Sequence, residues 1–420
     1  MQESRPGLRQ AFVALHHRSF RMFFAASLVQ GFGGQMQQMA NLWLIYSITG
    51  SALQLGLTGL ARAVPSIVFT LIGGVIADRM ERRRLIVFAQ LGSGILALVL
   101  GTLAVLGLIE VWHIYAVTFL GGALGSVSQP AQRSVIAHLV PRHHLMNAMA
   151  MRFSLNQMNS IIGPSLGGVL IATFGAAVTY LFNGAALAVT AAMLIRIDMG
   201  EAPPPAANSA VASLIEGFAY VRKRSVILAL LSVDSVTMFF GPYQVFLPII
   251  AAQFGLGPQG YGLLASAPGV GAVLGSVTVM SLGNFPYKGI LISAALLAYS
   301  VCLIGLALSP WFVVALVALA SVGFADSMNA TTRAATIQLL APDEFRGRVS
   351  SIQQMLQGGI PSLGQGLMGG IATVVGVPAA LIAGGLIGGA CNLGILFANR
   401  ELRSRELGMD LEPVGGSIRT

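Results

Sequence analysis

The sequence predicts an all-α membrane protein with 12 transmembrane helices, arranged as two pseudo-symmetric six-helix bundles. Three observations lead to this fold class: the composition, the number of long apolar runs and the placement of basic residues. Of the 420 residues, 55% are hydrophobic and 9% are charged, and the mean hydropathy is +0.78. A soluble domain carries about 25% charged residues, so this composition excludes a soluble globular protein.

Twelve apolar runs are long enough to cross a bilayer, which takes about 20 helical residues. We number them 1 to 12 in chain order. The runs lie near residues 22–46, 52–77, 85–108, 112–132, 146–173, 176–195, 226–250, 260–282, 289–308, 311–331, 349–375 and 378–397.

Basic residues predict the orientation, because Lys and Arg are retained in cytoplasmic loops. With the N-terminus in the cytoplasm, 22 of the 24 Lys and Arg residues fall on that side, and the six outer loops contain none. The other two, Arg62 and Arg152, lie within runs 2 and 5. We expect a multi-pass protein of the inner (plasma) membrane with both termini cytoplasmic. Its net charge of +9 then reflects topology, with anionic inner-leaflet lipid and not nucleic acid as the partner.

The chain divides into two halves joined by a cytoplasmic linker. We predict one bundle over residues 1–200, a linker over 201–224 and a second bundle over 225–420. The linker combines the stiff run of prolines at 203–205 with an amphipathic helix that ends in Arg222, Lys223 and Arg224.

Short motifs repeat between the two halves. Pro164-Ser-Leu-Gly167 in run 5 corresponds to Pro361-Ser-Leu-Gly364 in run 11, 197 residues later. The Arg133 to Pro141 segment corresponds to Arg333 to Pro342, 200 to 201 residues later. The two offsets differ by about one helical turn.

The loop between runs 2 and 3 carries an Asp-Arg motif. The pattern Gly-x-x-x-Asp-Arg-x-x-Arg-Arg is formed by Gly74, Asp78, Arg79, Arg82 and Arg83. Together with the helix count, this pattern resembles the signature loop of the major facilitator superfamily, although Glu81 stands where many members have Gly. The resemblance implies the major facilitator fold, with the binding site between the two bundles. It also implies a conformational-switch loop, whose acidic residue faces the positive N-terminus of helix 11 in one state and releases it in the next.

Two further motifs narrow the resemblance. The segment from Pro342 to Val349 is similar to the helix 10–11 loop of the secretion-effector branch, which includes enterobactin exporters and macrolide efflux pumps. Gly163, Pro164 and Gly167 resemble the core of the antiporter motif, although Asn159 replaces one of its earlier glycines. These resemblances imply a secondary active exporter that works by alternating access.

Two acidic residues lie well inside the runs and are the candidates for proton coupling. Asp234 lies about 12 Å from the inner edge of run 7, and Asp326 lies in the inner half of run 10. An acid at such depth is costly, and burial favours its protonated form. The alternative is a structural hydrogen bond or a pair with an arginine. Arg333 lies seven residues after Asp326 on the same helix face, and we assign Arg333 and its counterpart Arg133 to an inner gate.

Polar stripes on several runs mark candidate cavity walls. Each stripe follows helical spacing, and the alternative is hydrogen bonding between helices. Met238 adds the adaptable apolar surface that promiscuous sites use. The candidate substrate-binding residues are Gln30, Gln37, Asn41, Gln129, Asn156, Met238, Gln244 and Gln357.

The sequence favours neither a metal site nor an enzyme. His138, His143 and His144 do not follow a metal-ligand spacing, and no phosphate-binding glycine loop of the Walker type occurs. Cys302 and Cys391 both lie in apolar runs and are expected to be free thiols. We therefore expect no cofactor and no catalytic residues.

The favoured function is proton-coupled export of amphiphilic small molecules, such as drugs or siderophores, by a monomer. Two alternatives in transport are a lysophospholipid flippase and a small-molecule importer. An alternative from another class is a non-transporting membrane receptor or scaffold. The sequence does not name the substrate.

The predicted orientation is tested by cysteine labelling. A cysteine placed at Gly257, in an outer loop, should react with an impermeant reagent added from outside, because no membrane shields it. A cysteine placed at Gln2 should not react. The opposite labelling pattern would overturn the topology.

Overall fold

The computed structural model describes residues 13–79, 81–197, 210–283, 285–404 and 407. These residues are helical, and no strand occurs among them. The α-helices are α2 (Arg18–Thr49), α3 (Ala52–Arg79), α4 (Arg82–Val105), α5 (Val111–Leu139), α6 (Leu145–Phe174), α7 (Ala176–Ile195), α8 (Ala210–Lys223), α9 (Ser225–Phe240), α10 (Leu247–Gln253), α11 (Pro258–Leu282), α12 (Lys288–Ala307), α13 (Phe312–Leu340), α14 (Asp343–Val375) and α15 (Val377–Ala398). Short 3-10 helices are η1 (Val13–His16), η2 (Arg142–His144), η3 (Tyr243–Phe246) and η4 (Glu401–Arg403).

The helices confirm the all-α fold class, since eleven of the twelve predicted apolar runs each correspond to one helix. Over the described residues, nine segments are long and apolar enough to cross a membrane. The three longest helices, α2, α6 and α14, are not among the nine. Gln and Asn side chains interrupt their apolar sequences. The number of twelve spans therefore stays a prediction.

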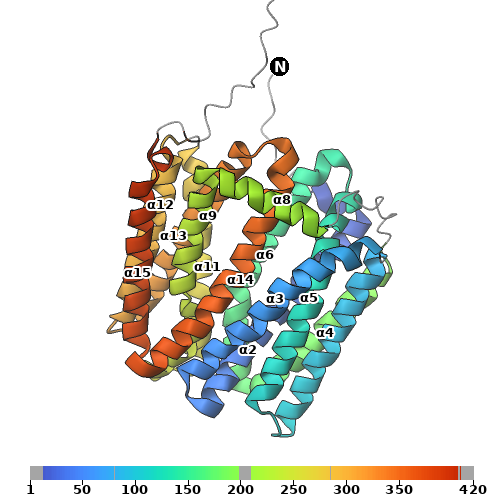
Figure 1. Cartoon of the computed structure of the whole chain (residues 1–420). Coiled ribbons are helices and arrows are strands. Elements are labelled where there is room, and N and C mark those ends of the chain that lie inside the picture. The colour runs from blue at the N-terminus through green and yellow to red at the C-terminus, as the bar shows by residue number, and fades with distance from the viewer. Residues whose placement is uncertain (1–12, 80, 198–209, 284, 405–406, 408–420) are drawn as a thin grey trace, which may run out of the picture. The chain divides into compact units, whose positions relative to one another are not determined.

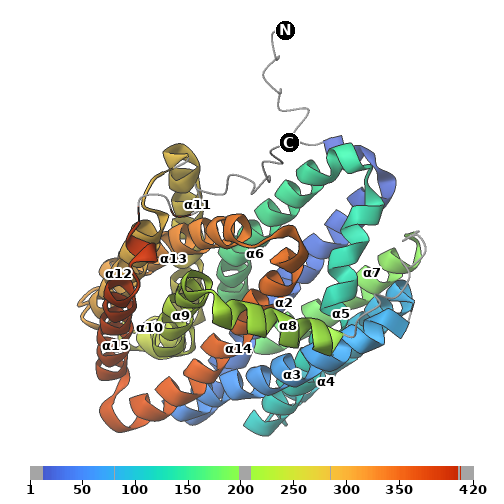
Figure 2. The same cartoon turned by 45° about the horizontal axis from the view of Figure 1, so that its top comes forward.

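The Cα positions group into two compact units. The first unit comprises Met1–Ala210 and Gln244–Gly269, and the second comprises Val211–Tyr243 and Val270–Thr420. In the first unit, α4 packs against α5 and α7, α2 packs against α6 and α7, and α3 packs against α5. In the second, α12 packs against α13 and α15, and Figures 1 and 2 show α12 and α15 side by side. The domain boundaries predicted at 200 and 225 stay predictions.

Equivalent one-residue turns end the fifth helix of each sequence half. Gly175 joins α6 to α7 with φ of 81°, and Gly376 joins α14 to α15 with φ of 84°. A backbone in this region favours glycine, because a Cβ would be strained there. Pro164 lies 11 residues before Gly175, whereas Pro361 lies 15 residues before Gly376. The distances from Pro141 to Gly175 and from Pro342 to Gly376 are equal, so the slip between the repeats is a shift of the proline motif by about one turn toward the start of α14.

The seventh predicted run is not one continuous helix, which corrects the expectation for residues 226–250. Helix α9 ends at Phe240, and the chain continues through η3 into α10. Pro242 has no N–H to donate and disfavours helical backbone before it, so the helix ends there. The hydroxyl of Tyr299 donates to the carbonyl oxygen of Gly241 at 2.7 Å, which satisfies a backbone group freed by the break.

Some predicted residues lie outside what the structure describes. This group includes the side chains of Asp78, Arg79 and Arg82 and the surroundings of Gly74, all in the proposed switch loop. It also includes the side chain of the gate residue Arg133. Residues 201–209 of the predicted linker are also outside. Residues 210–223 of the predicted linker form α8. Arg83, the remaining motif residue, lies 3.8 Å from Glu81.

Helices α6 and α11 meet within the first unit through small residues. The hydroxyls of Ser165 and Ser266 are 2.8 Å apart. A Cβ built on Gly168 would lie 2.6 Å from the carbonyl oxygen of Pro258 and 3.0 Å from the Cα of Gly262. Glycine at these positions lets the two backbones approach closely, as is common between membrane helices.

This contact predicts efficient cross-linking of α6 to α11. With Cys302 and Cys391 replaced by serine, the pair Ser165→Cys and Ser266→Cys should form a disulfide under mild oxidation, because the two side chains face each other. Adding Gly168→Val should reduce the disulfide yield several-fold. Gly125→Ala is the matched control, since a Cβ there meets no atom within 4 Å. Equal yields with Gly168→Val and Gly125→Ala would contradict the close approach.

Candidate functional site

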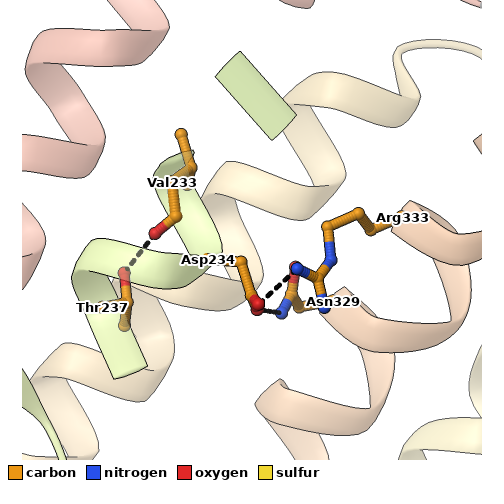
Figure 3. A network of polar contacts seen from close by, with 5 residues as sticks. All are labelled: Val233, Asp234, Thr237, Asn329 and Arg333. Atoms are coloured by element: carbon orange, nitrogen blue, oxygen red, sulfur yellow. Dashed lines mark hydrogen bonds and ion pairs between the residues drawn. The ribbon is translucent and has the colours of Figure 1, made fainter. Parts of the chain in front are cut away.

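A buried polar network joins α9 to α13 in the second unit (Figure 3). Asp234 on α9 faces Asn329 and Arg333, which lie one turn apart on α13 and therefore share a face. The amide of Asn329 donates to one carboxylate oxygen of Asp234 at 2.8 Å, and the Arg333 guanidinium forms an ion pair with the other oxygen. The exposed fractions are 5% for Asp234, 0% for Asn329 and 2% for Arg333.

Arg333 forms its ion pair with Asp234. The sequence had suggested Asp326 as a possible partner of Arg333. Seven residues along one helix place Asp326 and Arg333 about 10 Å apart along the axis, whereas Asp234 reaches across from the neighbouring helix. Asp326 is half-buried and forms no ion pair with the basic residues that the structure describes. Their roles in proton coupling and gating stay predictions.

The network has unused hydrogen-bonding capacity. Arg333 Nε, Asn329 Oδ1 and Thr332 Oγ1 are buried and have no partner among the described residues. A buried polar group without a partner costs about 1–3 kcal/mol. Both carboxylate oxygens of Asp234 are thus paired. Arg333 retains a free donor and Asn329 a free acceptor, which could bind a further polar group or form other hydrogen bonds after a rearrangement.

Asp234 does not lie on the continuous polar face that the sequence suggests. Because α9 ends at Phe240, Gln244 falls in η3 and is exposed. Met238 is half-buried and packs beside the core of the second unit. Thr237, one turn after Asp234, donates its hydroxyl to the carbonyl of Val233 at 2.9 Å (Figure 3).

The first unit contains a polar cavity of about 480 Å³ between α2, α5 and α6. Amide side chains dominate its wall, and Arg152 contributes a guanidinium. A smaller cavity of about 220 Å³ extends the polar region toward α4 and α7 and shares Gln30, Gly34 and Gln132 with it. The residues lining the larger cavity are Ser27, Gln30, Gly31, Gly34, Gln35, Gln38, Gln132, Arg152, Leu155, Asn156 and Asn159.

Four of the predicted substrate residues fall into two groups. Gln30 and Asn156 line the polar cavity, and Gln30 also accepts a hydrogen bond from Gln90 at 2.9 Å. Gln37 and Asn41 are instead engaged between helices. Gln37 accepts from Asn183 of α7, and Asn41 accepts from the hydroxyl of Tyr180 of α7 at 2.9 Å.

The remaining two candidates, Gln129 on α5 and Gln357 on α14, are exposed. Contact of the eight predicted residues with substrate stays a prediction.

The antiporter-like motif packs against α2. A Cβ on Gly163 would lie 2.7 Å from Gln35, and one on Gly167 would lie 3.2 Å from Met39. Pro164 is buried in the same helix. The motif residues thus set the spacing between α2 and α6, the two helices that supply most of the polar cavity.

The second unit contains an apolar cavity of about 570 Å³ between α8, α9 and α14. Its walls are mainly aliphatic, and Arg222 is the charged residue among those that line it. The two units therefore offer cavities of opposite character, one rich in amides and one apolar.

Sequence reasoning missed several of these residues. Asn329 and Gln90 lie in apolar runs and carry no motif. The spacing of Asn329 and Arg333, four residues apart on one helix, is a signal that could have linked Asn329 to the buried charge.

Comparison with known proteins agrees with the helical architecture. A family model described as transmembrane secretion effector matches residues 9–410. The enterobactin exporter EntS of Shigella flexneri is 27% identical over 393 residues, which cover 92% of this chain and 94% of that protein. EntS of Escherichia coli O1:K1 / APEC is 25% identical over 392 residues, with the same coverage.

Solved structures share the fold. A bacterial homolog of the human lysosomal transporter Spinster superposes with a TM-score of 0.71 at 13% identity, covering 95% of this chain and 99% of that chain. The D-xylose-proton symporter superposes with a TM-score of 0.70 at 15% identity, covering 90% of this chain and 96% of that chain. At these identities the likeness concerns the fold alone.

The buried network predicts strong coupling between Asp234 and Arg333. Arg333→Gln leaves a carboxylate buried without its counter-charge and should destabilise the protein by about 3–5 kcal/mol. Asp234→Asn should also be costly, whereas the double variant should lose less than the sum of the two. Unfolding of the purified protein in detergent, followed by denaturant titration, measures these differences.

The matched control pairs Arg333→Gln with Glu110→Gln, at the exposed start of α5 in the first unit. These two sites share no partner, so their effects should add within about 0.5 kcal/mol. Additive effects for Asp234 and Arg333 would contradict the ion pair.

Proposed function

Because this chain belongs to the transmembrane secretion effector family of the major facilitator superfamily, we propose that it exports amphiphilic small molecules across the inner membrane in exchange for protons. Membership of the family makes it a multi-pass membrane transporter of a small-molecule substrate and not an enzyme. The direction of transport, the coupling to protons and the alternating-access mechanism are our proposals.

The observation that carries proton coupling is the buried contact of Asp234 with Arg333 and Asn329. Protonation would neutralise Asp234 and leave the Arg333 charge in a dry interior without compensation. An uncompensated buried charge costs several kcal/mol, so the pair would separate or Arg333 would find another anion. Binding of one proton would thereby be linked to a rearrangement of α9 against α13.

The polar cavity of the first unit supports the choice of substrate class. Its amides and the Arg152 guanidinium suit a polar, oxygen-rich group, because they supply donors and acceptors in a confined space. The curated relatives are named as exporters of enterobactin, so enterobactin is the first compound to test.

Transport in everted membrane vesicles tests the proposal. With a pH gradient, acid inside, the wild-type protein should accumulate enterobactin or another member of a siderophore and drug panel. Asp234→Asn mimics the protonated carboxyl and cannot cycle, so accumulation should fall to the level without a gradient. Downhill equilibration of the same compound should persist.

Asp326→Asn is the matched comparison, since it removes the other carboxyl within the predicted spans. We expect it to keep gradient-driven accumulation. Normal accumulation by Asp234→Asn together with loss in Asp326→Asn would transfer the coupling role to Asp326. If only labelled lysophospholipid moves, the protein is a flippase. Accumulation with the opposite gradient would favour an importer. If no compound moves, a receptor or scaffold is favoured.

A further inference from the structure

The apolar cavity of the second unit is lined by residues of three helices, α8, α9 and α14. Phe218 and Val221 of α8 cover it, Leu228 and Leu231 of α9 form one wall, and Leu356 of α14 contributes to the other. Between Leu228 and Val236 the α9 wall runs for about 12 Å along the helix axis. The cavity is thus an elongated apolar groove.

Several contacts fix α8 over the start of α14. Glu216 forms an ion pair with Arg348 at 2.9 Å. The ring of Tyr220 stacks on that of Phe345, with centroids 4.4 Å apart and planes 13° apart. Gly217 allows the two helices to approach, since a Cβ there would lie 3.0 Å from Ile352. Figure 2 shows α8 beside α9 and α14, the two other helices whose residues line the groove.

The end of α8 places positive charge beside this groove. Arg222 lines the cavity, and Lys223 follows it in the chain. Both side chains are exposed, and neither forms an ion pair with the acidic residues that the structure describes. Arg224, the third cation of the run, lies over the ring of Tyr220 at 5.9 Å.

A narrow apolar groove with unpaired cations at its side has the chemistry of a site for an anionic amphiphile. The positive-inside pattern puts the Arg222–Arg224 run on the cytoplasmic side, where anionic phospholipids are abundant. The exposed apolar side chains Phe218 and Leu228 border the groove, as expected for a surface that lipid chains reach.

We propose that this groove binds an anionic phospholipid of the inner leaflet, with one acyl chain between α9 and α14 and the phosphate on Arg222 and Lys223. The bound chain contacts α14 at residues 352–360, directly before Pro361. The site does not depend on the transport proposal, because it requires neither a substrate nor a proton gradient.

Fluorescence quenching by brominated lipid tests the site. Trp43, Trp112 and Trp311 are replaced by phenylalanine, and Phe218→Trp supplies a reporter at the groove. In nanodiscs of phosphatidylcholine, brominated phosphatidylglycerol should quench this reporter at a much lower mole fraction than brominated phosphatidylcholine does. Removing Arg222 and Lys223 as glutamines should weaken the preference by roughly fivefold for each basic residue.

Leu393→Trp is the matched reporter, because Leu393 is an exposed apolar residue on α15, away from the groove. Both brominated lipids should quench it equally, before and after removal of Arg222 and Lys223, which also checks that the variants fold. Equal quenching of the Phe218→Trp reporter by both lipids would overturn the proposal, as would a preference that survives the loss of both cations.

Discussion

Arg333 carries a full positive charge into the interior of the second unit, where its side chain is 2% exposed. Such a charge is tolerated only with a counter-charge and hydrogen bonds, and Asp234 together with Asn329 provides both. The requirement ties α9 to α13, two helices that α12 also joins, and it explains why a carboxylate lies so deep in an apolar run. The packing of the second unit and its proposed chemistry therefore depend on the same ion pair.

The two halves of the chain share a plan and differ in chemistry. Gly175 and Gly376 form the same one-residue turn, and prolines lie at related positions in α6 and α14. The first unit nevertheless places its polar groups around a cavity, as neutral amides with Arg152. The second unit concentrates its polarity in one charged pair and leaves an apolar groove beside it. A substrate cavity in one unit and a proton site in the other are compatible with this division.

The apolar runs predicted the helices well, because a membrane helix needs about 20 apolar residues wherever it packs. The sequence also singled out Asp234, since charges within such runs are rare, and Arg333, because it lies seven residues after Asp326 on the same helix face. Their pairing was not predictable, because the two residues are 99 positions apart and meet only through the packing of α9 on α13.

Gln37 and Asn41 illustrate the same limit. A polar stripe that faces a cavity and one that faces another helix look the same in the sequence. Here the stripe contacts Asn183 and Tyr180 of the neighbouring helix α7. The break at Pro242 was not predicted either, because a proline alone does not mark a break: Pro65, Pro164, Pro268 and Pro361 all lie inside continuous helices.

In the proposed mechanism Asp234 takes up a proton and thereby loses its pair with Arg333. Infrared difference spectroscopy of the reconstituted protein, recorded as the pH is lowered, detects a protonated carboxyl directly by its C=O stretching band. We expect a band that appears on acidification, is absent in Asp234→Asn and persists in Asp326→Asn. A spectrum in which Asp234 stays ionised over the whole pH range that supports transport would contradict it.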